Sequence, residues 1–120
     1  RSTLFPYTTL FRSGVACAIL LTPVLKFNAP STADKYRDIA VAMGVKNTED
    51  MSIEQARQAC IEAVEKLSVD VGIPQKLTQL GVKEEDLQFL SESAFVDACT
   101  PGNPRDVSVE AIKEIYKSIM

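Results

Sequence analysis

The side chains of this chain that could do chemistry are three cysteines and a set of carboxylates, and histidine is absent. Cys17, Cys60 and Cys99 form no C-x-x-C pair, so the spacing indicates neither a zinc ribbon nor a dithiol redox centre. Without histidine, the chain has no Ser-His-Asp triad and no imidazole metal ligand. The carboxylates stand mostly at expected helix starts or on polar faces, where charge is simply solvated. We therefore expect no catalytic residue, no cofactor-binding residue and no metal ligand within the chain.

Composition and charge narrow the class of protein and its partners. A hydrophobic content of 46% with 24% charged residues is typical of a soluble globular domain. The net charge of -3, without any cluster of Lys or Arg, argues against nucleic acid as a partner. The longest apolar run, Val15 to Leu21, is too short to cross a membrane, so we expect no membrane partner. Free thiols at an odd number of cysteines favour a reducing, cytoplasmic location.

The first thirteen residues, RSTLFPYTTLFRS, are best explained as a translated sequencing adapter. They can be back-translated codon by codon, in one frame, into a short-read adapter that is in wide use. A native apolar strand is the alternative, because Leu4, Phe5 and Phe11 could belong to one. We expect residues 1–13 to be an artefact that packs poorly, and residues 14–120 to be a protein from which the upstream part was lost.

From Gly14 onward the pattern predicts an all-α helical bundle of five or six helices, since no useful period-2 alternation occurs. The first helix, 15–27, is apolar on nearly all sides, with an expected break or kink at Thr22-Pro23. Ser31 and Asp34 resemble an N-cap and its acidic partner for the second helix, which Gly44 ends. The apolar stripe of this second helix is Tyr36, Ile39, Ala40 and Met43.

Further capping and stop signals divide the rest of the chain. Ser52 and Gln55 form a capping box for a third helix, which ends at Gly72 before Pro74. A short helix at 75–80 and a helix with acidic residues 84–86 in its first turn follow, and Ser108 begins the last helix. The expected stripes of the three longer helices are Ile53, Ala56, Cys60, Ala63, Leu67 and Val71; Leu87, Leu90, Ala94 and Ala98; and Val109, Ile112, Ile115, Tyr116 and Ile119.

Five blocks carry a resemblance that goes beyond a helical bundle. They are, in chain order, GVACAILL, VLKFNAP, ADKYRDIAVAMGV, LSVDVGIPQKLTQLGVKEEDL and DACTPGNPR. Together, from Gly14 to Met120, they resemble the C-terminal quarter of iron-containing alcohol dehydrogenases (group III), of the lactaldehyde reductase and 1,3-propanediol dehydrogenase type.

The resemblance implies a two-domain parent enzyme that interconverts small alcohols and aldehydes. Its N-terminal α/β domain would bind NAD(P), and its helical domain would supply one Asp and three His to Fe(II). A homo-oligomeric parent is compatible with this. The last of those His would directly precede Gly14, where this chain has Ser13 of the adapter-like segment. The resemblance therefore implies an inactive fragment that holds neither the iron nor the nucleotide.

One segment of the match could retain a role in the substrate cleft. In the family, the loop that corresponds to residues 99–105 lies close to that cleft, so Cys99 is our candidate substrate-pocket residue. The alternative is purely structural: Asn103 and Arg105 would cap helices and hold the loop, while Cys99 would fill core space as a small hydrophobe. For the whole chain, the rival to a dehydrogenase fragment is a non-catalytic helical protein-interaction module.

Overall fold

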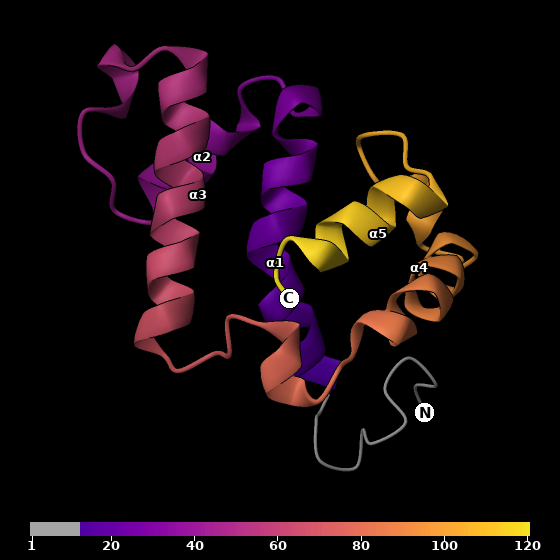
Figure 1. Cartoon of the computed structure of the whole chain (residues 1–120). Coiled ribbons are helices and arrows are strands. Elements are labelled where there is room, and N and C mark those ends of the chain that lie inside the picture. Colours follow the sequence, from indigo (N-terminus) through magenta and orange to yellow (C-terminus); the bar gives the residue numbers. More distant parts are fainter. Residues whose placement is uncertain (1–12) are drawn as a thin grey trace.

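The structure is a computed structural model that describes residues 13–120, and the regular secondary structure of these residues is entirely helical (Figure 1). It contains α1 (Ser13–Asn28), α2 (Lys35–Ala42), α3 (Ile53–Asp70), α4 (Leu87–Phe95) and α5 (Val109–Lys117). Short 3-10 turns join these helices: Ala29–Ser31, Thr48–Asp50, Leu77–Leu80, Glu84–Asp86 and Thr100–Gly102. The predicted all-α fold is confirmed. Our expectation for the adapter-like segment concerns residues that lie, except for Ser13, outside the described part.

Helix α1 is the central element, with one pair of helices on each side of it. Helices α2 and α3 pack against each other, as do α4 and α5, and α1 contacts both α3 and α5 (Figure 1). This order explains why α1 is apolar nearly all round, because a helix with neighbours on two sides must bury two faces. No described helix is both long and apolar enough to span a bilayer.

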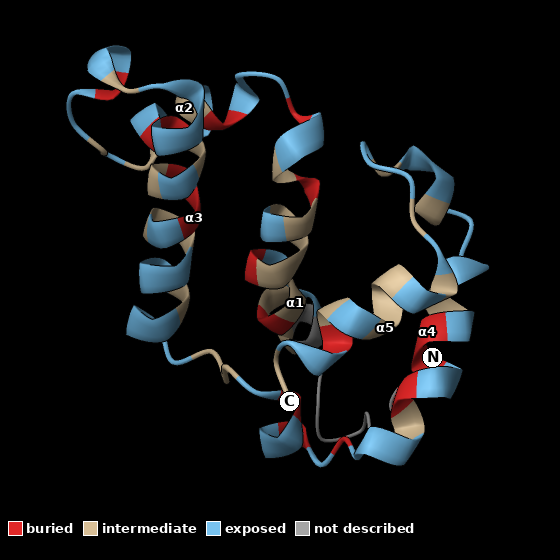
Figure 2. Ribbon diagram, turned by 45° about the horizontal axis from the view of Figure 1, so that its top comes forward, coloured by how far each residue is buried: buried red, intermediate tan, exposed pale blue. Residues whose placement is uncertain are grey.

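The described residues form two hydrophobic clusters, one in each half of the molecule (Figure 2). The larger cluster gathers Ile19 with buried side chains of the 77–90 region and α5: Leu77, Leu80, Val82, Leu87, Leu90 and Tyr116. The smaller cluster lies between α2 and α3 and contains Tyr36, Ala40, Cys60 and Ile61, with Leu25 of α1 packed against it. Helix α1 therefore joins the two clusters by contributing side chains to both.

Most of the predicted helix ends are confirmed. The Ser52 side chain accepts from the Gln55 backbone at 3.1 Å, and the Gln55 side chain accepts from the Ser52 backbone at 2.8 Å. Ser108 caps α5 by accepting from the Ala111 backbone at 3.1 Å. Gly44 and Gly72 follow the ends of α2 and α3 with φ values of 89° and 84°, the left-handed conformation that favours glycine.

Of the break or kink expected at Thr22-Pro23, the break is wrong, because α1 continues through Pro23 to Asn28, and the kink stays a prediction. Proline removes one backbone donor from the helix. Burial of Ile19 before it and packing of Leu25 after it stabilise the helix on both sides.

The expected N-cap at Ser31 is also wrong, since α2 begins at Lys35. Ala33 has a positive φ of 49°, so the chain cannot run as a helix from Ser31 onward. The Thr32 hydroxyl instead closes the preceding turn by donating to the Ala29 carbonyl at 2.8 Å. Asp34, expected to assist the cap, accepts from Arg37 Nε at 2.8 Å.

The four predicted stripes are buried over only part of their length. In α2, Ile39 is exposed while Tyr36 and Ala40 are buried. In α3, Ala56 and Cys60 are buried, but Leu67 and Val71 are 51% and 63% exposed. Helix α4 ends at Phe95, three residues before Ala98, which is exposed. In α5 only Tyr116 is fully buried, and the other predicted inward side chains are half-buried.

Candidate functional site

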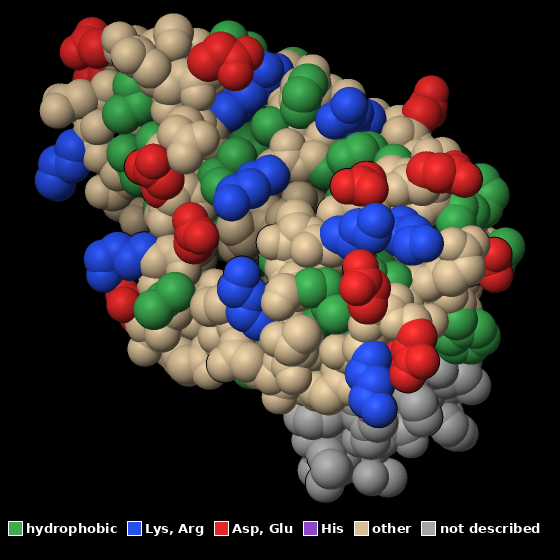
Figure 3. All heavy atoms as spheres, in the orientation of Figure 1, with side chains coloured by type: hydrophobic (Ala, Val, Ile, Leu, Met, Phe, Trp, Pro, Cys, Tyr) green, Lys and Arg blue, Asp and Glu red, His purple; other side chains and the backbone are tan. Residues whose placement is uncertain are grey.

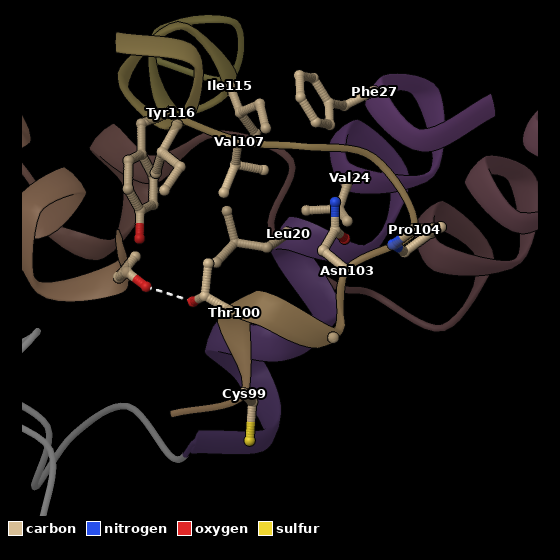
Figure 4. Close-up of a pocket in the computed structure, with 13 residues that line it drawn as sticks. Leu20, Val24, Phe27, Cys99, Thr100, Asn103, Pro104, Val107, Ile115 and Tyr116 are labelled. Carbon is tan, nitrogen blue, oxygen red and sulfur yellow. Dashed lines mark hydrogen bonds between the residues drawn. The ribbon is translucent and has the colours of Figure 1, made fainter. Parts of the chain in front are cut away.

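The candidate site is a cavity of about 440 Å³ between α1, α5 and the segment that follows α4 (Figure 4). This volume lies within the range of small-molecule sites in proteins. Apolar side chains make up most of the wall. Helix α1 and helix α5 provide Leu20, Val24, Phe27, Ile112, Ile115 and Tyr116, and the segment from α4 to α5 provides Ala94, Cys99, Thr100, Gly102, Asn103, Pro104 and Val107.

The two helical walls follow directly from the spacing of their residues. Leu20, Val24 and Phe27 recur at i, i+4 and i+7, so they share one face of α1. Ile112, Ile115 and Tyr116 recur at i, i+3 and i+4, so they share one face of α5. The cavity therefore forms where an apolar face of α1 meets the apolar face of α5 without complete contact.

The third wall is the segment 99–107, hereafter the cavity loop. The Thr100 hydroxyl donates to the Ala94 carbonyl, which closes the end of α4 (Figure 4). The Asp97 carboxylate accepts from the Cys99 backbone at 2.8 Å. These two local bonds explain why α4 stops before Ala98, because side chains take the place of the next helical turn.

The far side of the cavity loop is attached to the end of α1. The side-chain amides of Asn28 and Asn103 donate to each other, at 2.9 Å and 2.8 Å. Arg105 Nη1 donates to the Phe27 carbonyl at 2.7 Å, and its guanidinium lies 4.3 Å from the centre of the Phe27 ring. The expectation that Asn103 and Arg105 hold the loop is confirmed, and Arg105 caps the last turn of α1.

Cys99 is at the edge of the cavity rather than in the core. It is among the lining residues, but it is exposed, and in Figure 4 its sulfur points away from the other labelled side chains. The structural alternative in which Cys99 fills core space is therefore wrong. Its role in a substrate pocket stays a prediction.

The site has little capacity for proton transfer or metal binding. Burial raises the pKa of Tyr116 above its ordinary value, which keeps the phenol protonated across the neutral range. Among residues 13–120, no group of three or more Cys, Asp or Glu side chains is arranged to hold a metal ion. Lys and Arg alternate with Asp and Glu on the face that Figure 3 shows. The arrangement can bind and shape an apolar group and exclude water from it.

Sequence patterns pointed to only part of this site. They singled out Cys99, Asn103 and Arg105, all on the cavity loop, and placed Ile112, Ile115 and Tyr116 on an inward face. They missed Leu20, Val24 and Phe27 as lining residues, although the helical spacing of these three was a usable signal. They also missed Asn28, since nothing local indicates a partner 75 positions away.

Comparison with known proteins gives a consistent result. The family model "Fe-containing alcohol dehydrogenase family, C-terminal" matches residues 11–120. Lactaldehyde reductase of Escherichia coli (strain K12) is 53% identical over 103 residues, which cover 86% of this chain and 27% of that protein. 1,3-Propanediol dehydrogenase of Citrobacter freundii is 41% identical over 104 residues, covering 87% of this chain and 27% of that protein.

A solved structure agrees with these sequence matches. A 1,3-propanediol oxidoreductase superposes with a TM-score of 0.85 at 38% identity, covering 89% of this chain and 28% of the other. The chain thus spans about a quarter of the length of the relatives that it matches.

Proposed function

The chain belongs to the Fe-containing alcohol dehydrogenase family, and from that membership we propose that it is the C-terminal part of an iron-dependent, NAD(P)-dependent alcohol dehydrogenase. The complete protein would interconvert small alcohols and aldehydes by hydride transfer in the cytoplasm. The chain alone would be inactive, because it covers about a quarter of its relatives.

One observation carries this proposal. The identity of 53% to a lactaldehyde reductase extends over 103 residues, almost the whole of the chain that follows the adapter-like segment. Identity at this level over most of the chain supports a shared site as well as a shared fold. The substrate class is proposed from the relatives that are described as acting on lactaldehyde and 1,3-propanediol.

Within such an enzyme, this chain would supply the apolar wall of the substrate cleft. Leu20, Val24 and Tyr116 line a cavity large enough for a small alcohol, and none of them is charged. Apolar walls exclude water, which favours hydride transfer by preventing competing reactions and by strengthening electrostatic interactions at the reacting group. Cys99, at the edge of the cavity, would contact the substrate and restrict its size.

The residues described here do not fit an iron site. The chain has no histidine, and the described residues contain no cluster of three possible ligands. The metal and the nicotinamide nucleotide would both be held by upstream residues, including the histidine that the family resemblance places where Ser13 stands. No chemical step can therefore be assigned to the side chains of this chain.

The decisive experiment uses the complete gene. The codons before Gly14 are read from the source DNA, and the complete protein is expressed beside the 120-residue chain. Reduction of small aldehydes with NADH and NADPH is followed by the loss of nicotinamide absorbance, with and without added Fe(II) and after chelation. We expect iron-dependent activity in the complete protein and none in the short chain.

Two results would contradict the proposal. An upstream sequence without the expected histidine before Gly14 would remove the metal site. A folded, iron-loaded complete protein that reduces no aldehyde and oxidises no alcohol would favour the alternative, a helical module that acts only by binding another protein.

A further inference from the structure

The cavity loop and α1 form opposite walls of the cavity, and they are joined at one end by three side chains. Asn28 is the last residue of α1, and Asn103 and Arg105 belong to the cavity loop. Asn103 lines the cavity, and Arg105 follows the lining residue Pro104. We call these three residues the clasp. The clasp makes three side-chain hydrogen bonds between the loop and the end of α1, and these bonds hold the two walls together at that end.

The amide of Asn103 is used almost completely. Its nitrogen donates twice, to Asn28 Oδ1 at 2.8 Å and to the Arg105 carbonyl at 2.7 Å, and its oxygen accepts from Asn28 Nδ2 at 2.9 Å. An Asn side chain has two donor hydrogens, so both are committed. An aspartate at this position has the same shape but no donor, and it would lose two of the three bonds.

Burial makes these bonds specific. Asn28 is only 7% exposed, so an amide that lost its partner there would not be fully hydrated. Leaving a buried polar group unpaired costs more than the bond itself contributes. The pair therefore favours a single arrangement of the loop against the end of α1.

Arg105 adds a second connection to a residue that lines the cavity. Arg105 donates a hydrogen bond to the Phe27 carbonyl, and its guanidinium lies over the Phe27 ring. Phe27 is itself one of the residues that line the cavity. A planar guanidinium can make both contacts at once, whereas the ammonium of lysine is a point charge without a flat face. Arg105 thus fixes both the backbone and the ring of Phe27.

We propose that Asn28, Asn103 and Arg105 are positioning residues that set the width of the cavity, and thereby the size of alcohol or aldehyde that the complete enzyme accepts. They act through the loop and through Phe27 and need not touch the reacting atoms. The role in substrate size rests on the proposed function. The mechanical part of the inference, that the clasp holds the cavity loop against α1, rests on the contacts alone.

The mechanical part is tested on the 120-residue chain by hydrogen exchange. The reporters are the backbone amides of Gly102 and Asn103, which donate within the loop at 3.1 Å and 3.0 Å. In Asn103→Asp we expect these amides to exchange about tenfold faster, as the loss of two hydrogen bonds implies. The matched control is Asn47→Asp, whose position at φ 62° tolerates Asp and whose side chain makes no hydrogen bond within residues 13–120.

The size role is tested on the complete enzyme with aldehydes of two to six carbons. For Arg105→Lys, which changes no residue of the cavity lining, we expect the KM of the longest aldehyde to change by about fivefold or more relative to the shortest, while kcat for the shortest stays within about twofold. Asn103 lines the cavity, so for Asn103→Asp we expect the same change in relative KM and make no requirement on kcat. The Asn47→Asp control should leave both ratios unchanged.

Each result decides one part. Unchanged loop exchange in Asn103→Asp overturns the mechanical role, and an equal loss of kcat for all aldehydes overturns the size role. A complete protein without any activity overturns the proposed function and the size role with it, whereas the exchange result remains separate evidence on the clasp.

Discussion

The hydroxyl of Tyr36 donates a hydrogen bond of 2.8 Å to the backbone carbonyl of Leu25. The carbonyls in the last turn of a helix lack partners within the helix. Here a side chain of α2 supplies one partner, and Arg105 supplies another at Phe27. The end of α1 is thus closed from both sides, which ties the α2–α3 pair and the cavity loop to the same turn.

The first prediction concerns this bond. Tyr36→Phe keeps the ring in the core but leaves the Leu25 carbonyl without its donor. We expect the free energy of unfolding to fall by about 1–2 kcal/mol, measured by urea denaturation. The control is Tyr116→Phe, because the Tyr116 hydroxyl donates no hydrogen bond within the described chain. Equal losses in the two variants would contradict the assignment.

The second prediction compares two serines that the sequence presents as equivalent caps. Ser52→Ala removes a capping box and should lower the free energy of unfolding by about 1 kcal/mol. Ser31→Ala should change it by less than about 0.5 kcal/mol, because Ser31 ends a 3-10 turn and α2 begins only at Lys35. A larger loss at Ser31 than at Ser52 in thermal melts would contradict the structure.

The different outcomes at Ser52 and Ser31 indicate what the sequence could predict. Local signals identified the helices: a capping box, an apolar stripe and a glycine stop agree in α3, and a serine cap and a stripe agree in α5. The Ser31 cap failed because Ala33, with φ 49°, interrupts the helix, and the Ala33 carbonyl accepts from Arg57 of α3 at 2.8 Å, a contact 24 positions away that local signals do not reveal. The break expected at Pro23 failed for the same reason: burial on two sides of α1 outweighs one missing hydrogen bond.

The site was less predictable than the fold. Cys99, Asn103 and Arg105 were found because they lie in one motif, DACTPGNPR. Asn28 and Phe27 were not, since their contacts with the loop join residues 75 and 78 positions apart. Periodicity reveals which face of a helix is apolar, but it does not reveal which other element will meet that face.

The third prediction is a loss of stability at alkaline pH. Burial raises the pKa of Cys60 in the folded chain above that of a free thiol, which is about 8.5. Below about pH 8.5 both states hold the proton. As the pH rises further toward the folded pKa, the unfolded state releases the proton first, so the stability declines.

The measurement is the urea midpoint between pH 7.5 and 9.5, a range chosen below the titration of the tyrosines at about pH 10. Burial also raises the pKa of Tyr36 and Tyr116, so their effect adds only at higher pH. Cys60→Ala should show a smaller decline than the parent chain over this range, although it is less stable at every pH. The exposed Cys17 provides the control, and Cys17→Ala should retain the full decline.

The fourth prediction concerns the apolar end of α3. Leu67 and Val71 lie one turn apart and are 51% and 63% exposed, so they form one uncovered face. We expect the 120-residue chain to self-associate as its concentration increases, and Leu67→Gln with Val71→Gln to weaken that association. Sedimentation equilibrium measures both, with Lys46→Gln as a surface control. Association that the double variant leaves unchanged would place the contact elsewhere.

The last prediction concerns Cys99 in the complete enzyme. A thiol has no required step when a nicotinamide carries the hydride, and this one lies at the edge of an apolar cavity. Replacing Cys99 with Ala or Val should therefore change KM and the preference among aldehydes more than it lowers kcat for the smallest substrate. Ala should favour larger aldehydes, because its side chain is smaller than that of Cys and leaves more room in the cleft. Val should favour smaller aldehydes, because its side chain is larger than that of Cys. If Cys99→Ala abolished turnover of every substrate in a folded, metal-loaded enzyme, the thiol would have to take part in the reaction itself.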